Sequence, residues 1–145
     1  MKTILVTGSN GLLGQKITEK ILNERNVNLI ATSKGGNRFP CKEGYLYAEM
    51  DISNAEEVHT VVERYKPDAI IHTAAVTNVD LAEANKELAF ELNVRAVQTL
   101  IEVCEKNDIQ LVHLSTDFIF DGANGPYAEE AYGPFAPSKI KSVDK

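Results

Sequence analysis

The sequence predicts an α/β fold in which a parallel sheet is wound on both sides by helices. Short apolar runs alternate along the chain with longer segments whose apolar residues recur at helical spacing. Strands separated by helices pair in parallel, because each crossover returns the chain to the same end of the sheet. A glycine-rich turn, TGSNGLLG (residues 7–14), joins the first apolar run to the first helical segment. This strand–turn–helix start also favours a doubly wound sheet.

Each element follows from its own pattern. Five strands are expected, at residues 2–7, 27–32, 45–50, 68–72 and 110–115. A helix over 12–25 separates apolar from charged residues, and a second, over about 54–65, begins after an N-cap at Ser53 or Asn54 and ends before Pro67. A third helix is expected over about 81–106, whereas residues 34–44 contain too many helix breakers and are predicted to form a loop.

Right-handed crossovers give these strands the Rossmann-like order 3-2-1-4-5, with the switch point between the first and fourth strands. Ligands bind such sheets outside the carboxyl ends of the strands, close to the switch point. We therefore expect the chemistry to lie at residues 8–14, 72–77 and 115–117.

Composition excludes several classes of protein. The 145 residues carry a net charge of −6, which argues against nucleic acid or an anionic membrane as a partner. No apolar run reaches the length of a signal peptide or a membrane span, so a cytoplasmic protein is expected. Cys41 and Cys104 lie far apart, which favours neither a zinc site nor a disulfide framework. No metal site is expected, because His59, His72 and His113 have no second ligand at metal spacing; structural roles are expected for them.

The three glycines of the turn each have a physical task. Gly8 permits the tight turn, Gly11 lets the backbone approach a pyrophosphate, and Gly14 lets the helix pack on the strand. The phosphates would meet the free N–H groups at the helix N-terminus. The alternative is a plain strand–helix turn. The candidate cofactor-binding residues of the turn are Gly8, Ser9, Asn10, Gly11, Leu12, Leu13 and Gly14.

Further motifs follow in order along the chain. Asp51-Ile52 follows the third strand, HTAA (residues 72–75) the fourth, Asn93 lies in the long helical segment, and STDFIFDG (residues 115–122) follows the fifth strand. Together with the GxxGxxG spacing, these motifs resemble the extended branch of the short-chain dehydrogenase/reductase superfamily. Over about residues 1–130 they look most like the dTDP-4-dehydrorhamnose reductases. The resemblance implies an NADP-dependent oxidoreductase that reduces a nucleotide-linked 4-keto sugar, dTDP-4-dehydrorhamnose, to dTDP-rhamnose.

The resemblance also assigns tasks to residues beyond the glycine turn. Asp51 would accept a hydrogen bond from the adenine amino group while Ile52 packs on the ring, although both also fit a simple helix start. Small side chains at Ala74 and Ala75 would let the dinucleotide lie close to the strand, and the Thr77 hydroxyl would face the nicotinamide; plain tight packing is the alternative. Asn93 completes the set of expected cofactor-binding residues.

The end of the second strand bears on the choice of cofactor. An acidic residue there would bind the ribose hydroxyls of NAD and repel a 2′-phosphate. This chain has Ser33, Lys34 and Arg38 instead, which favours NADP and leaves NAD possible. A solvated basic loop is the alternative interpretation.

The candidate catalytic residues match the pattern of the resembled family only in part. The resembled family polarises the keto group with a Ser or Thr hydroxyl, which Thr116 matches, and protonates it with a Tyr placed four residues before a Lys. Here Lys139 has Phe135 at that spacing. Tyr132 and Lys139 are therefore the candidate pair, with a different separation, and Phe118 stands where the motif usually has Tyr.

This departure keeps other functions open. A non-catalytic NADP-binding protein, resembling the regulatory subunit of methionine adenosyltransferase, would not need the tyrosine. A sugar-nucleotide epimerase or dehydratase of the same superfamily would retain bound NAD, and the missing acidic residue after the second strand counts against it.

The chain changes character near its end. Residues 1–122 are expected to form the NAD(P)-binding domain, and residues 123–145, with Pro126, Pro134 and Pro137, an irregular segment leading toward a substrate-binding part. Since no sixth strand follows, the fold looks truncated after strand five. The fifth strand should then expose an edge and an apolar face, which predicts a homodimer or aggregation.

Overall fold

The computed structural model describes residues 1–116 and 125–128. The chain divides into two compact units, Met1–His113 and Leu114–Lys145. All the helices and strands described below belong to the first unit.

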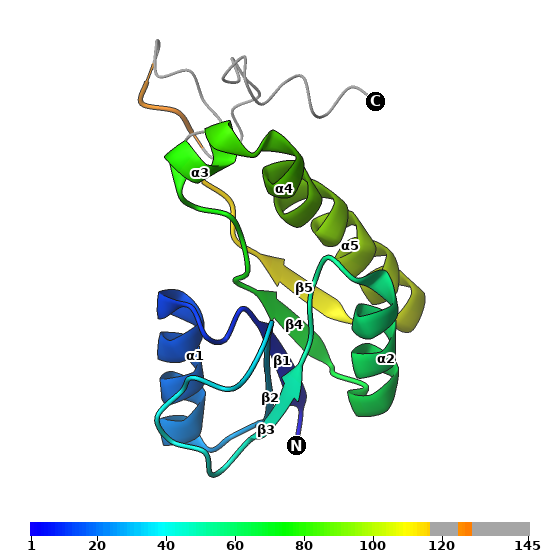
Figure 1. The fold of residues 1–145 in the computed structure, drawn as a ribbon. Helices are drawn as coiled ribbons and strands as arrows, with labels where there is room; N and C mark the ends of the chain where they lie inside the picture. The colour runs from blue at the N-terminus through cyan, green and yellow to red at the C-terminus, as the bar shows by residue number, and fades with distance from the viewer. Residues whose placement is uncertain (117–124, 129–145) are drawn as a thin grey trace. The chain divides into compact units, whose positions relative to one another are not determined.

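A five-stranded parallel sheet forms the centre of the first unit (Figure 1). Its strands are β1 (Thr3–Thr7), β2 (Asn28–Ser33), β3 (Leu46–Glu49), β4 (Ala69–His72) and β5 (Gln110–His113). They lie in the order β3-β2-β1-β4-β5, which confirms the predicted topology. Every neighbouring pair is parallel, and Thr7 is in register with both Thr32 and His72.

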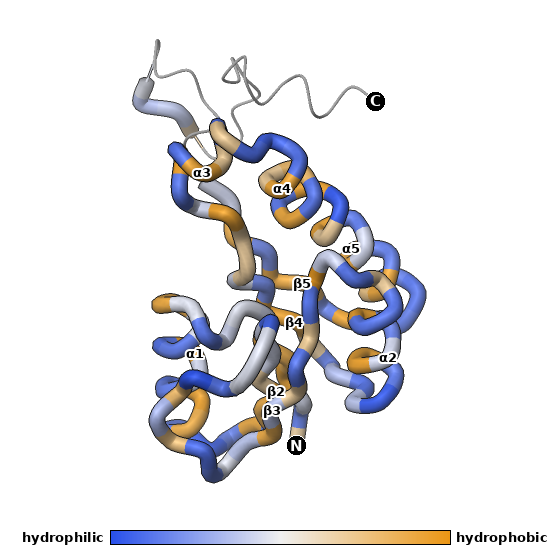
Figure 2. Tube along the Cα trace, viewed as in Figure 1, coloured by the Kyte–Doolittle hydropathy of each residue, from blue (hydrophilic) through white to orange (hydrophobic). Residues whose placement is uncertain are grey.

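Helices cover both faces of the sheet. α1 (Leu12–Glu24) contacts β1 and β2 on one face, and α2 (Ala55–Tyr65) and α5 (Ala96–Asn107) lie on the other (Figure 1). Hydrophobic residues concentrate along the strands, whereas hydrophobic and hydrophilic residues alternate around α2 and α5 (Figure 2). This is the pattern of helices that bury one stripe against a sheet.

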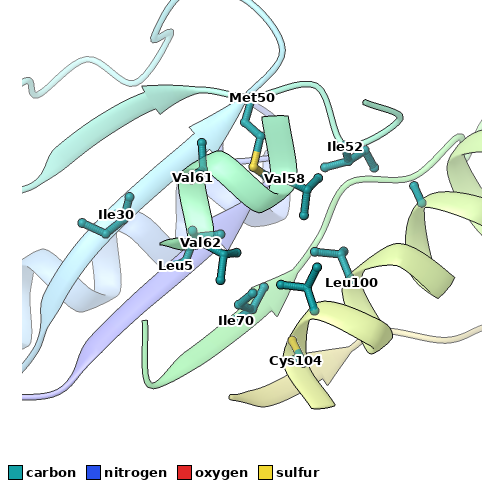
Figure 3. Close-up of a cluster of buried hydrophobic side chains, with 12 residues drawn as sticks. Leu5, Ile30, Met50, Ile52, Val58, Val61, Val62, Ile70, Leu100 and Cys104 are labelled. Carbon is teal, nitrogen blue, oxygen red and sulfur yellow. The ribbon is translucent and has the colours of Figure 1, made fainter. Parts of the chain in front are cut away.

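The main core lies between the sheet and the helices α2 and α5 (Figure 3). Leu5, Ile30 and Ile70 stand side by side in register, so their side chains share this face. Each fully buried aliphatic side chain contributes about 1.5–3 kcal/mol of transfer free energy. The buried cluster comprises Leu5, Ile30, Met50, Ile52, Val58, Val61, Val62, Ile70, Ala96, Leu100, Val103 and Cys104.

The start of α2 confirms one of the two predicted caps. The Asn54 side chain accepts hydrogen bonds from the N–H groups of Glu56 and Glu57, at 3.1 and 3.4 Å. Two donors that the first turn leaves without a helical partner are thereby satisfied. At the other end Lys66 adopts a left-handed conformation, and Pro67 follows.

The single helix predicted over 81–106 is wrong. The structure has α3 (Val79–Ala84), α4 (Lys86–Phe90), a π-helical turn η1 (Glu91–Arg95) and then α5. Asn85 leaves the helical conformation, and its side chain accepts a hydrogen bond from the N–H of Leu88 at 3.1 Å. The side chain thus caps a new helix, a competition with the backbone that apolar spacing does not reveal.

Other boundaries shift by a few residues. β5 ends at His113, two residues before the predicted end of that strand. Residues 34–44 form the predicted loop between β2 and β3. In the described ranges, 1–116 and 125–128, no helix is long and apolar enough to cross a membrane.

Candidate functional site

The glycine turn brings the ends of β1 and β4 close together. Gly8 has φ +68°, a conformation that other residues rarely adopt, and a Cβ atom there would lie 2.7 Å from the backbone nitrogen of Ala74. No side chain fits in this space. The turn therefore packs directly against the backbone of the segment that follows β4.

Gly14 and Gly11 have different surroundings. A Cβ atom on Gly14 would lie 2.3 Å from the carbonyl oxygen of Gly8, so only glycine allows α1 to pack on the turn. A Cβ atom on Gly11 would meet, among the atoms of the described residues, only that same oxygen, at 3.3 Å. Gly11 is exposed, and close packing within the protein does not explain why this position lacks a side chain.

Gly11 is also the N-cap of α1. It provides no side-chain acceptor, and the first turn of the helix carries no acidic residue. The first N–H groups of an α-helix have no partner within the helix, and they add to its positive end. These features together form a cradle for a phosphate group, so the residues present fit the pyrophosphate of a dinucleotide.

The remaining residues of the turn divide into buried and exposed ones. Ser9 is buried, and its N–H donates to the Thr32 carbonyl at 2.9 Å, which ties the turn to β2. Leu12 is 84% exposed and Leu13 is also exposed, although both are large apolar side chains. They flank the cradle at the start of α1.

Asn10 joins the turn to the β2–β3 loop. Its Nδ2 donates to the carbonyl of Gly36 at 3.0 Å, and its Oδ1 accepts from the N–H of Arg38 at 2.8 Å. The backbone oxygen of Asn10 accepts from Nε2 of Gln15, in α1, at 2.9 Å. The sequence placed Asn10 in the motif but gave no signal for this contact between segments 26 and 28 residues apart.

Lys34 and Asp51 form an ion pair with an Nζ–Oδ2 distance of 2.6 Å. Burial acts to raise the pKa of the Asp51 carboxyl, but hydrogen bonds from Lys34 and Ser53 outweigh it and hold that pKa below its usual value. The hydrogen bond with Asp51, reinforced by its charge, raises the pKa of Lys34. The sequence predicts that Lys34 and Asp51 contact different parts of a cofactor, whereas the structure pairs them with each other. Ser33, at the end of β2, is half-buried beside them.

Asp51 and Ile52 have unequal access to the surface. Asp51 Oδ1 accepts hydrogen bonds from the N–H and the hydroxyl of Ser53, at 3.0 and 2.7 Å. Ile52 belongs to the main core and is only 7% exposed. The Ile52 side chain therefore packs chiefly within the protein, and only its edge is available to an adenine ring.

A side chain from the π-helical turn holds the segment after β4. Asn93 accepts from the N–H of Val76 at 2.8 Å and donates to its carbonyl at 3.0 Å. This pair of bonds fixes the backbone between Ala75 and Thr77, both of which are exposed. π-Helical turns occur often at functional sites, and this one aims the Asn93 amide at the loop. Asn93 therefore contacts the loop directly, a role that the motif did not indicate.

His72 lies in a row of residues at the carboxyl end of the sheet. It is 2% exposed, its Nδ1 lies 2.7 Å from Thr7 Oγ1, and its ring stacks on that of His113 with centroids 5.3 Å apart. Burial, with a smaller effect of His113, lowers the pKa of His72 to about 4. Its Nε2 is buried and has no hydrogen-bond partner within the described ranges, so the expected structural role holds for one ring nitrogen only.

Of the three candidate catalytic residues, the structure describes Thr116. It belongs to the second compact unit, Leu114–Lys145. Tyr132 and Lys139 lie outside the described residues. The residues that the structure does bring together at the carboxyl edge of the sheet are those of the glycine turn, the β2–β3 loop, Asp51 and Ala74.

Comparison with known proteins places this chain in a family. Residues 1–139 match the RmlD substrate binding domain family. The chain belongs to this family. Its similarity to proteins named as sugar-nucleotide reductases confirms the resemblance found from the motifs.

Two curated relatives and one solved structure illustrate this membership. The chain is 32% identical over 130 residues to dTDP-4-dehydrorhamnose reductase of Aggregatibacter actinomycetemcomitans, covering 89% of this chain and 40% of that protein. It is 30% identical over 129 residues to methionine adenosyltransferase 2 subunit beta of Rattus norvegicus, covering 89% and 36%. UDP-glucose 4-epimerase of Thermus thermophilus, solved in complex with NAD, superposes with a TM-score of 0.76 at 27% identity, over 88% of this chain and 42% of that one. The chain spans about 40% of the length of these relatives.

Proposed function

We propose that this chain forms the cofactor-binding portion of an NADP-dependent reductase that converts the 4-keto group of dTDP-4-dehydrorhamnose to the hydroxyl of dTDP-rhamnose. The observation that carries this proposal is the cradle at Gly11. It lies at the switch point of the sheet, the helix N-terminus stands beside it, and no side chain among residues 1–116 and 125–128 fills it. The similarity to dTDP-4-dehydrorhamnose reductase supports the choice of substrate.

The parts of the site would divide the cofactor between them. The N–H groups at the start of α1 would hold the pyrophosphate. Asp51 and the β2–β3 loop would hold the adenosine end, and the segment Ala74–Thr77 the nicotinamide end. Ser33, Lys34 and Arg38 offer donors and positive charge to a 2′-phosphate, which is why we favour NADP over NAD.

Bound NADPH supplies the hydride for the reduction. The protein must then stabilise the negative charge that develops on the keto oxygen and deliver a proton to it. In our proposal the Thr116 hydroxyl donates a hydrogen bond to that oxygen. Tyr132 donates the proton, and the positive charge of Lys139 favours its release by lowering the pKa of the phenol.

Turnover tests the reductase directly. The purified reductase of which this chain is the proposed cofactor-binding portion should oxidise NADPH, followed by the loss of its absorbance, only when dTDP-4-dehydrorhamnose is added. Thr116→Val removes the hydroxyl at nearly constant volume and should lower kcat by about 10²-fold or more while leaving NADPH affinity unchanged. Thr60→Val, the same change on the exposed side of α2, is the matched control and should behave as wild type. A Thr116→Val variant with normal kcat would remove Thr116 from the mechanism.

A second candidate function is a non-catalytic regulatory protein. The similarity to methionine adenosyltransferase 2 subunit beta favours it, as does Phe135 at the spacing where the reductases have Tyr. Such a protein would bind NADPH without consuming it in the same assay. A superfamily epimerase would instead convert its sugar substrate with NAD retained and no net change in the absorbance of the reduced cofactor.

A further inference from the structure

Two side chains fix the backbone of the β2–β3 loop from outside it. Asn10, from the glycine turn, binds the carbonyl of Gly36 and the N–H of Arg38. Tyr47, from β3, donates its hydroxyl to the carbonyls of Ser33, at 3.3 Å, and of Gly35. The backbone is therefore held on both sides of residue 34 and at residue 38 itself.

The cations in this loop remain accessible. The Lys34 side chain is 80% exposed and Arg38 is exposed, so fixing the backbone does not bury either charge. The Arg38 guanidinium lies close enough to Tyr47 for its charge to affect the pKa of the Tyr47 hydroxyl. Burial raises the pKa of Tyr47, with Asn10 and Arg38 acting in the opposite direction. The Tyr47 hydroxyl consequently stays protonated at neutral pH and serves as a donor.

Asn10 links these cations to the phosphate cradle. Its own backbone is held by Gln15 of α1, so the glycine turn and the β2–β3 loop are joined through successive hydrogen bonds. These bonds fix the distance between the N-terminus of α1, which suits one phosphate group, and the cations Lys34 and Arg38, which suit a second phosphate group. A molecule with a pyrophosphate and a separate phosphomonoester on the same adenosine has this chemistry.

We propose that Asn10 and Tyr47 are positioning residues for a 2′-phosphate subsite, in which Arg38 and Lys34 bind the phosphate; this inference rests on the proposed function. Ordering the loop before the cofactor arrives reduces the entropy that binding would otherwise cost. Lys34 leaves the Asp51 carboxylate for the 2′-phosphate when the cofactor binds. NADP and NAD differ only in that phosphate, so the two residues act on one cofactor and not on the other.

Binding measured by calorimetry with NADPH, NADH, 2′,5′-ADP and 5′-AMP tests the inference; the chain has no Trp for a fluorescence assay. Tyr47→Phe should weaken the binding of NADPH and 2′,5′-ADP about tenfold, the effect of one lost hydrogen bond, and leave the affinities for NADH and 5′-AMP within about twofold of wild type. Asn10→Ala should weaken NADPH more than NADH. Tyr65→Phe, the same loss of a hydroxyl on α2, is the matched control and should bind both cofactors as wild type does.

A double variant distinguishes a positioning role of Tyr47 from a general loss of structure. In the Arg38→Ala variant, Tyr47→Phe should have little further effect on NADPH, because the cation that it positions is gone. Equal losses for NADPH and NADH, or none for either, would overturn the inference while leaving the proposed function in place. A wild-type chain that binds neither NADPH nor NADH would overturn the proposed function itself.

Discussion

At the scale of single residues, the three glycines of the turn serve two different purposes. Gly8 and Gly14 are required by the protein itself, because a Cβ atom at either would lie under 3 Å from backbone atoms. At Gly11 a Cβ atom would meet a single oxygen within the described part of the chain. A ligand that approaches the backbone explains Gly11, whereas the fold explains the other two.

This difference predicts opposite outcomes for two alanine substitutions. Gly14→Ala should lower the free energy of unfolding by about 3 kcal/mol, as overpacking against backbone does, in urea denaturation. Gly11→Ala should change it by no more than about 1 kcal/mol, the size of an N-cap effect, yet weaken NADPH binding about tenfold or more. Wild-type affinity in Gly11→Ala would show that no phosphate approaches this position.

At the scale of elements, the carboxyl end of the sheet holds a row of side chains from adjacent strands. Thr7 of β1, His72 of β4 and His113 of β5 are in register, and His72 contacts both neighbours. Sequence spacing placed the two histidines near strand ends, but only the pairing of β4 with β5 stacks their rings. Burial then favours the neutral form of His72.

The His72 pKa predicts how stability depends on pH. The folded-state pKa is about 4, below the ordinary value of 6.5, so the unfolded chain binds more protons between these values. Burial of neutral His72 therefore makes the free energy of unfolding depend on pH by about 3 kcal/mol. This stabilisation is fully present above pH 6.5 and is lost as the pH falls to about 4. His72→Asn, which keeps a polar atom near Thr7, should remove this part of the acid sensitivity in urea denaturation at neutral pH and at about pH 4. His59→Gln on α2 is the control, and a His72→Asn profile parallel to wild type would contradict the assignment.

At the scale of the whole molecule, both edge strands of the sheet carry an exposed apolar side chain. β3 and β5 form the edges, and each exposes an aliphatic side chain, Leu46 at 56% and Val112 at 44%. Val112 is in register with Ile71 of β4 and follows Leu111, which packs against the main core, so the Val112 side chain lies on the opposite face of the sheet. Exposed edges with apolar residues favour association between copies.

We therefore expect the chain to self-associate through β5. Sedimentation velocity should show species heavier than the 16.0 kDa monomer. Val112→Lys should shift the distribution toward monomer, because a charge on the strand opposes pairing. Leu46→Lys, the same change on the opposite edge, should leave it unchanged. A monodisperse monomer for the unmodified chain would contradict this prediction.

The sequence by itself determined the fold class, the strand order, the glycine turn and the family. These rest on local signals, namely apolar periodicity, cap residues and glycine spacing, combined with the fixed hand of parallel crossovers. Even the break at Asn85 is a local event, but it was missed because asparagine suits both a helix surface and a cap.

Only the tertiary structure decided how the site is held together. The bonds of Asn10 to the β2–β3 loop, of Asn93 to Val76 and of His72 to Thr7 join residues 17 to 65 positions apart. The pairing of Lys34 with Asp51 likewise depends on β2 and β3 lying side by side. Hydrogen bonds and ion pairs act over a few ångströms, so they are fixed by which strands become neighbours and not by spacing along the chain.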